Sequence, residues 1–209
     1  MASESQRTAL LVDWGGVLTT NLFTSFGAFC EDEGLKPESL AQHFRSDGEF
    51  RSLLIGFEEG SVEETDFEQG LGGLLGVSPL GLIDRLFARV GPDAAMLAAV
   101  EAARAAGIRT GLVSNSWGTR RYDRTMLAEL FDGVVISGEV GMRKPAPEMY
   151  RLGAERTGAA PEQCVYVDDL PFNLPPAEEL GMATVHHVET TQTIAELERL
   201  LGMPLAPAG

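Results

Sequence analysis

The sequence predicts an α/β protein with an open, doubly wound parallel sheet and an all-helical insertion after the first strand. Short continuous apolar segments alternate with helical patterns, which is typical of buried parallel strands. Between residues 20 and 90 this alternation stops, because the apolar residues there recur at helical spacing. Polar residues end several of the apolar segments, where ligands bind in sheets of this kind.

Each strand of the predicted sheet is a short apolar segment, and a helical pattern lies between each pair of strands after the insertion. The strands are expected at 8–13, 109–114, 133–137, 164–168 and 182–186. The helices are expected at 93–106, 119–130, 146–157, 175–180 and 191–201. Gly107 follows the first of these helices as a suitable C-terminal cap. This alternation predicts helices on both faces of an open sheet.

The insertion is predicted to contain four or five short helices. Turn residues divide it at 34–37, 60–61 and 76–79. We therefore predict two parts: an α/β core domain formed by residues 1–19 and 91–209, and a helical cap subdomain formed by residues 20–90.

The composition narrows the classes of partner. The chain has 209 residues and a net charge of −15, from 31 acidic and 16 basic residues. Such a surface repels nucleic acids and anionic membranes. No apolar stretch approaches the ~20 residues that span a bilayer, and the N-terminal segment lacks the features of a signal peptide. Cys30 and Cys164 are expected to be reduced and buried, and the protein is expected to be cytoplasmic.

Polar residues at the ends of the predicted strands are expected to converge. Crowded carboxylates repel one another unless a cation shares the site, and oxygen ligands without nearby His or Cys favour Mg²⁺. A lysine together with Mg²⁺ offsets the charge of a phosphoryl group, and an aspartate can attack phosphorus. The converging residues are Asp13, Ser114, Asn115, Lys144, Asp168 and Asp169.

Four segments, in order, resemble the motifs of the haloacid dehalogenase (HAD) superfamily of hydrolases. They are L-L-V-D-W-G-G-V-L-T at 10–19, G-L-V-S-N-S-W at 111–117, G-M-R-K-P-A-P-E-M-Y at 141–150 and V-Y-V-D-D-L-P-F-N-L at 165–174. The helical insertion after the first motif is similar to one class of cap in this superfamily. From residue 110 onward the chain is most similar to the phosphatase-like domain at the N-terminus of soluble epoxide hydrolases.

This resemblance implies a magnesium-dependent phosphatase that acts on a small phosphorylated metabolite through an aspartyl-phosphate. Asp13 would be the nucleophile, and Lys144 would bridge it and the phosphoryl group. Ser114 and the Asn115 amide would bind the phosphoryl oxygens. The magnesium ligands would be Asp13, the carbonyl oxygen of Gly15, Asp168 and Asp169, and Asn173 would support the fourth motif.

The sequence allows two roles for each tryptophan in the motifs. Trp14 and Trp117 are candidates for substrate contact, although packing roles are equally compatible with the sequence. Arg143 is expected to face solvent. We expect a monomer or a homodimer.

The position of Gly15 departs from the resemblance. Most phosphatases of the superfamily have an aspartate there, which protonates the leaving group and later activates water. Loss of such a group costs ~10²–10⁴-fold in rate. The sequence leaves four outcomes open: a slow phosphatase, a substrate with a good leaving group, a proton donor from the cap, or no turnover. Glu58, Glu59 and Asp47 are the candidate donors.

Three alternative functions remain at this stage. A catalytically weak phosphate-binding or regulatory protein would explain Gly15. A carbon–phosphorus hydrolase resembling phosphonoacetaldehyde hydrolase would require Lys36, the sole lysine of the cap, to form a Schiff base. A 2-haloacid dehalogenase is disfavoured by Asp168 and Asp169, since those enzymes do not use a pair of acids in the fourth motif to bind Mg²⁺.

Overall fold

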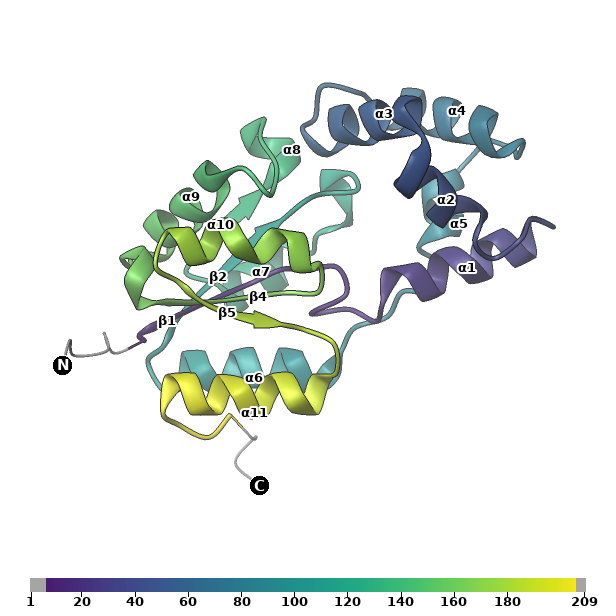
Figure 1. Ribbon diagram of the computed structural model, residues 1–209. Helices are drawn as coiled ribbons and strands as arrows, with labels where there is room; N and C mark the ends of the chain where they lie inside the picture. Colours follow the sequence, from purple (N-terminus) through teal and green to yellow (C-terminus); the bar gives the residue numbers. More distant parts are fainter. Residues whose placement is uncertain (1–6, 206–209) are drawn as a thin grey trace.

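The computed structural model describes residues 7–205, and its centre is a parallel sheet (Figure 1). Its five strands run in the order β3-β2-β1-β4-β5, as expected of a doubly wound sheet. Residues 1–6, to which the signal-peptide prediction in part refers, lie outside the described residues. The strands are β1 (Ala9–Val12), β2 (Arg109–Ser114), β3 (Gly133–Ile136), β4 (Cys164–Asp168) and β5 (Ala183–His186).

Helices cover both faces of the sheet because successive strand residues point to opposite sides. Leu10 and Val12 of β1 face one layer, formed by α6 (Ala94–Ala105), α7 (Arg124–Leu130) and α11 (Thr190–Leu201). Ala9 and Leu11 face the other layer, formed by α9 (Pro147–Thr157) and α10 (Leu174–Glu179). Figure 1 shows α6 and α11 below the sheet and α9 and α10 above it. The predicted α/β fold is therefore confirmed.

Two differences from the predicted elements have a local cause. The strand expected at 133–137 ends at Ile136, because Ser137 begins the short helix α8 (Ser137–Val140). The helix expected at 119–130 is split into a 3₁₀ turn, Thr119–Arg121, and α7. The side chain of Asp123 causes the second start, since its Oδ1 accepts hydrogen bonds from the N–H groups of Thr125 and Met126 at 2.9 and 3.1 Å.

The segment between β1 and α6 is helical, as predicted, and buries apolar side chains of its own. A cluster of phenylalanine and leucine side chains, including Phe26, Phe50 and Phe67, forms its centre. Asp47 separates the second and third helices of this segment, because its side chain caps the third helix by accepting hydrogen bonds from the N–H groups of Glu49 and Phe50. The helices are α1 (Leu22–Asp32), α2 (Ser39–Ser46), α3 (Gly48–Glu58), α4 (Glu64–Leu75) and α5 (Leu82–Leu86). We call this segment the cap.

The two chain segments that join the cap to the sheet pair with each other. The N–H of Thr20 donates to the carbonyl of Gly91 at 2.8 Å, and the N–H of Asp93 donates to the carbonyl of Leu18 at 2.9 Å. Between residues 7 and 205, no helix has the length and apolar character needed to cross a membrane.

Candidate active site

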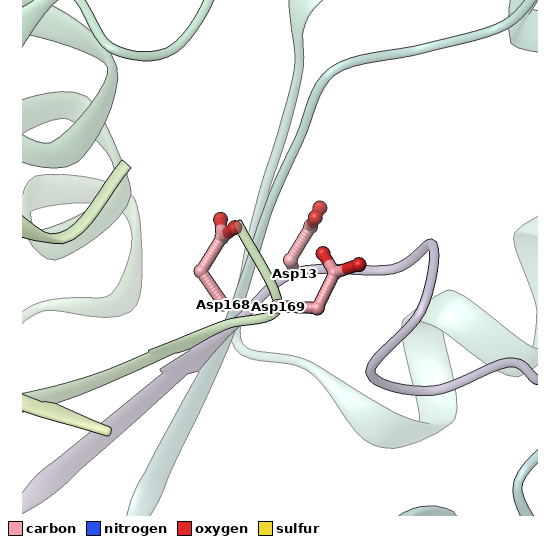
Figure 2. Close-up of side chains that lie close together, drawn as sticks. All are labelled: Asp13, Asp168 and Asp169. Carbon is pink, nitrogen blue, oxygen red and sulfur yellow. The ribbon is translucent and has the colours of Figure 1, made fainter. Parts of the chain in front are cut away.

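Three carboxylates meet at the carboxyl ends of two neighbouring strands (Figure 2). Asp13 directly follows β1, Asp168 ends β4, and Asp169 follows it. One oxygen atom from each of the three side chains lies within 4.8 Å of the others. Figure 2 shows the three side chains extending from the strand ends toward a common space. The parallel register of β1 and β4 thus brings together residues far apart in the sequence.

Lys144 bridges two of these carboxylates from a fully enclosed position. Its Nζ lies 2.8 Å from Oδ1 of Asp13 and 2.7 Å from Oδ2 of Asp168, and only 1% of the residue is exposed. Burial by itself would lower the pKa of Lys144, but the two carboxylates outweigh that effect and raise it. Lys144 therefore provides a fixed positive charge beside Asp13.

Asp168 is held in place by neutral hydrogen-bond donors as well as by Lys144. The hydroxyl of Tyr166 donates to its Oδ2. The N–H of Leu170 and Nδ2 of Asn173 each donate to its Oδ1 at 2.9 Å. Tyr150 in turn fixes Asn173 by donating its hydroxyl to the Asn173 carbonyl at 2.7 Å. These contacts orient the carboxylate before any ligand binds.

The electrostatics of the three carboxylates fit a cation. Burial raises the pKa of Asp13 to about 6, and Lys144 only partly offsets this effect. Burial, followed by the charges of Asp13 and Asp168, raises the pKa of Asp169 to about 7. Such shifts mean that the ionised forms are costly without a positive partner. A set of carboxylate oxygens suits a hard divalent ion, so this cluster could hold a metal.

The glycine after the first strand allows Asp169 to approach. Gly16 has φ of +77°, which favours glycine, and a Cβ atom there would lie 2.4 Å from Oδ2 of Asp169. Any larger residue at position 16 would displace this carboxylate.

Ser114 and Asn115 lie at the end of β2, beside Lys144. The Ser114 Oγ and the hydroxyl of Tyr122 are 2.9 Å apart. The Asn115 side chain holds the main chain of Lys144: its Oδ1 accepts from the Lys144 N–H at 2.8 Å, and its Nδ2 donates to the Lys144 carbonyl at 3.1 Å. Any contact between Asn115 and a phosphoryl group would therefore fall to its backbone N–H.

An apolar cavity of about 530 Å³ opens beside these residues, between the core and the cap. Both tryptophans of the chain belong to its wall. Trp117 also packs into the cap, with its ring centroid 5.2 Å from that of Phe26 and 5.6 Å from that of Phe87. The wall includes Trp14, Gly15, Leu18, Leu22, Phe87, Val90, Leu97, Ser114, Asn115, Trp117, Tyr122 and Met126, together with two arginines, Arg120 and Arg121.

At Gly15, the space for a side chain is filled by the cap. A Cβ atom on Gly15 would lie 2.7 Å from Cδ1 of Leu22, the first residue of α1. The flexible end of a leucine thus occupies the place where a longer side chain would begin.

Of the three cap acids named above, only Glu58 is buried. Asp47 caps α3 and lies 2.8 Å from Nδ1 of His43, and Glu59 is half-buried. Glu58 is 5% exposed and forms an ion pair with Arg143. The expectation that Arg143 faces solvent is therefore wrong, because its side chain turns toward the cap and is 23% exposed.

Sequence reasoning missed Tyr166 and Tyr122. Tyr166 had a usable signal, since it stands two residues before Asp168 in a strand and so shares its face. Tyr122 had no signal in the sequence, because its position depends on the break between the 3₁₀ turn and α7.

Lys36 is exposed, as its proline-containing turn suggested, and so lacks the burial that would activate an amine.

Comparisons with known proteins agree with this architecture. Bifunctional epoxide hydrolase 2 of Rattus norvegicus is 35% identical over 121 residues, which are 54% of this chain but only 22% of that protein. Sesquiterpene phosphatase astK of Aspergillus oryzae is 28% identical over 152 residues, covering 70% of this chain and 78% of that protein. The chain thus spans about a fifth of the length of the epoxide hydrolase.

Solved structures support the fold at lower sequence identity. A predicted HAD-like family hydrolase from Porphyromonas gingivalis has a TM-score of 0.73 at 22% identity, covering 94% of this chain and 98% of that one. A HAD family enzyme from Bacteroides thetaiotaomicron, in complex with magnesium and inorganic phosphate, has a TM-score of 0.65 at 22% identity, covering 87% and 94%. The model of the haloacid dehalogenase-like hydrolases matches residues 8–181, so this chain belongs to that family.

Proposed function

We propose that this protein is a Mg²⁺-dependent phosphatase that cleaves a phosphate monoester through an aspartyl-phosphate on Asp13. The observation that carries this proposal is the position of Lys144 between Asp13 and Asp168, with Asp169 beside them. A cation-binding carboxylate cluster next to a buried ammonium group suits a dianionic phosphoryl group.

In this reaction each residue of the site would have a separate role. Asp13 would attack phosphorus, and its orientation is fixed by the Trp14 N–H, which donates to Oδ1 at 2.7 Å. Lys144 would hold one phosphoryl oxygen. Ser114 and the N–H of Asn115 would bind the others from the end of β2. Bound Mg²⁺, held by Asp13, Asp168, Asp169 and the Gly15 carbonyl, would neutralise charge on the phosphoryl group.

The cavity wall suggests the kind of ester. Its lining is dominated by aromatic and aliphatic side chains such as Trp14, Leu22 and Met126. A phosphorylated small molecule with an apolar alcohol portion fits such a wall better than a polyhydroxylated one. The sesquiterpene phosphatase among the relatives is compatible with this choice.

The test is hydrolysis of a panel of aryl, alkyl, terpenyl and sugar phosphates with Mg²⁺, compared with Asp13→Asn. We expect activity to require Mg²⁺, to favour apolar esters, and to vanish in Asp13→Asn. Beryllium fluoride, a phosphoryl mimic, should form an adduct in the wild type and not in Asp13→Ala. Equal adduct formation in both proteins would reject Asp13 as the nucleophile.

Metal binding is tested separately by thermal unfolding. Mg²⁺ should raise the unfolding temperature of the wild type, because a ligand that binds only the folded state stabilises it. The unfolding temperature of Asp168→Ala should not change with Mg²⁺, because that variant lacks one of the metal ligands.

Gly15 favours one second candidate function, that of a phosphate-binding regulatory protein. Intact Mg²⁺ and phosphate binding without turnover of any ester would select that function.

A further inference from the structure

Glu58 occupies an enclosed position where the cap meets the core. It is the last residue of α3 and is 5% exposed. Within the described residues 7–205, the buried acidic side chains are Glu58, Asp13 and Asp168. Glu58 is thus the one buried acidic residue of the described cap. Burial of a charged carboxylate is energetically costly, so it is uncommon without a structural or functional role.

The main chain at Glu58 contacts the loop after β2 and the helix α8, both of which adjoin the candidate active site. Its carbonyl accepts a hydrogen bond from the Ser137 hydroxyl and one from the Ser116 hydroxyl at 3.5 Å. Two residues later, a Cβ atom on Gly60 would lie 2.7 Å from the carbonyl oxygen of Gly138, so only glycine fits there. These contacts fix the end of α3 against the loop that follows β2 and against α8, which follows β3.

The Glu58 carboxylate faces the charged groups of the site. Arg143 donates its Nε to Oε2 of Glu58, and Arg143 is the chain neighbour of Lys144. Burial raises the pKa of Glu58, the charges of Arg143 and Lys144 lower it, and the charge of Asp13 raises it. Glu58 in turn contributes to the raised pKa of Tyr122. The position at a helix C-terminus also disfavours the ionised form.

We propose, on the basis of the phosphatase function above, that Glu58 supplies from the cap the acid–base group that the first motif lacks at Gly15. The juxtaposition behind this proposal is a buried cap carboxylate that pairs with Arg143, on a main chain held by Ser116 and Ser137, close enough to Lys144 and Asp13 for their charges to act on it.

The proton balance of the two steps is complete. As an oxygen of Asp13 bonds to phosphorus, the bond between phosphorus and the ester oxygen breaks, and the departing alcohol takes the proton of the Glu58 carboxyl group. In the second step a water molecule gives one proton to the Glu58 carboxylate, and its oxygen bonds to phosphorus. The bond between Asp13 and phosphorus then breaks, which restores the Asp13 carboxylate and the protonated Glu58.

The test is the first turnover of Glu58→Gln on two esters with Mg²⁺. Glutamine keeps an acceptor for Arg143 but has no proton to transfer. Release of an alkyl alcohol, which needs protonation, should slow by ~10²–10⁴-fold. The first equivalent of 4-nitrophenol, a good leaving group, should still appear at nearly the wild-type rate, followed by slow turnover. Glu59→Gln is the matched control and should behave as wild type.

Arg143→Met separates proton transfer from a purely structural role. Without the guanidinium the pKa of Glu58 rises further, so the pH above which alkyl ester cleavage declines should move upward. That decline should disappear in Glu58→Gln. If Glu58 served only to hold the cap closed, both variants would slow both esters equally, and the inference would be overturned.

The remaining outcomes are also decisive. Unchanged alkyl cleavage in Glu58→Gln overturns the inference, and it reassigns the proton to Tyr122 if Tyr122→Phe shows the loss instead. Affinity for beryllium fluoride and the unfolding temperature should stay unchanged in Glu58→Gln. If they fall together with both activities, the residue is structural. A wild type that cleaves neither ester rejects the phosphatase function itself, whereas the results above reject only the role of Glu58.

Discussion

At the scale of single residues, the carboxylate cluster should make the metal-free protein sensitive to pH. The pKa of Asp169 is raised to about 7 from an ordinary value of 3.8. A group with a raised folded pKa contributes stability that is present at low pH and lost as pH rises through that value. We therefore expect the free energy of unfolding in EDTA to fall between about pH 4 and pH 7, from the ordinary pKa of Asp169 to its raised pKa.

Urea unfolding at both ends of this range measures the effect. Asp169→Asn should flatten the pH dependence, and saturating Mg²⁺ should remove it in the wild type, because the cation favours the ionised carboxylates. A pH dependence that is identical in the wild type and in Asp169→Asn would show that Asp169 does not carry this penalty.

Gly15 gives a second test at this scale. Because Leu22 fills the adjacent space, Gly15→Asp needs Leu22→Ala beside it to fit. In the wild-type background this pair should add little, since Glu58 already supplies the proton. In Glu58→Gln it should restore alkyl ester cleavage, up to the ~10²–10⁴-fold worth of a placed acid–base group. First-turnover rates measure the recovery, and no recovery in a folded, Mg²⁺-binding protein would contradict this reasoning.

The sequence predicted more of the core site than of the cap. Asp13 and Asp168 stand at strand ends, and Lys144 lies in the turn between α8 and α9, so the topology of the sheet brings them to the same edge. Glu58 could be named as a candidate but not placed, because its burial depends on Ser116, Ser137 and Arg143 from distant segments. For the same reason Arg143 was wrongly expected to face solvent.

At the scale of secondary structure elements, the loop after β2 contacts both the candidate active site and the cap. It follows the phosphate-site candidates Ser114 and Asn115, and its Trp117 packs among cap phenylalanines. Farther along, Arg120 pairs with Glu64, with 2.6 Å between Nη2 and Oε1. Movement of the cap would therefore act on the end of β2.

Trp117→Ala should weaken this connection. We expect a loss of up to about 3 kcal/mol in the free energy of unfolding, at the low end for a tryptophan because the side chain is only partly buried. Phosphate affinity should fall as well, because the loop supports Ser114 and Asn115. Calorimetry of phosphate binding with Mg²⁺ measures this, and Trp117→Phe, which retains aromatic packing, should recover most of both losses.

Element boundaries were predictable where a local signal existed. The strand at Arg109–Ser114 and the strand at Cys164–Asp168 match their predicted ranges, because each is a continuous apolar run with a polar end. The helix predicted at 119–130 was wrong in its first part. The capping by Asp123 that restarts the helix competes with an otherwise helical pattern, and the apolar spacing does not reveal it.

At the scale of the whole molecule, the alternation of strands and helices determined the architecture, because a parallel sheet needs a covering layer on each face. The division into a core of residues 1–19 and 91–209 and a cap of residues 20–90 remains a proposal. The pairing of Thr20 with Gly91 and of Leu18 with Asp93 makes these two crossings the natural place for a hinge.

The intrinsic fluorescence of the two tryptophans can be used to follow ligand binding in the cavity. The chain has 2 tryptophans, and both stand in the wall of the cavity between cap and core. Its intrinsic fluorescence therefore reports on that space. In Asp13→Asn with Mg²⁺, an alkyl phosphate, which does not absorb near the indole bands, should shift the emission to shorter wavelengths as water leaves the indole rings. Trp14→Phe should leave a signal from Trp117 alone, and an unchanged spectrum at saturation would place the alkyl chain elsewhere.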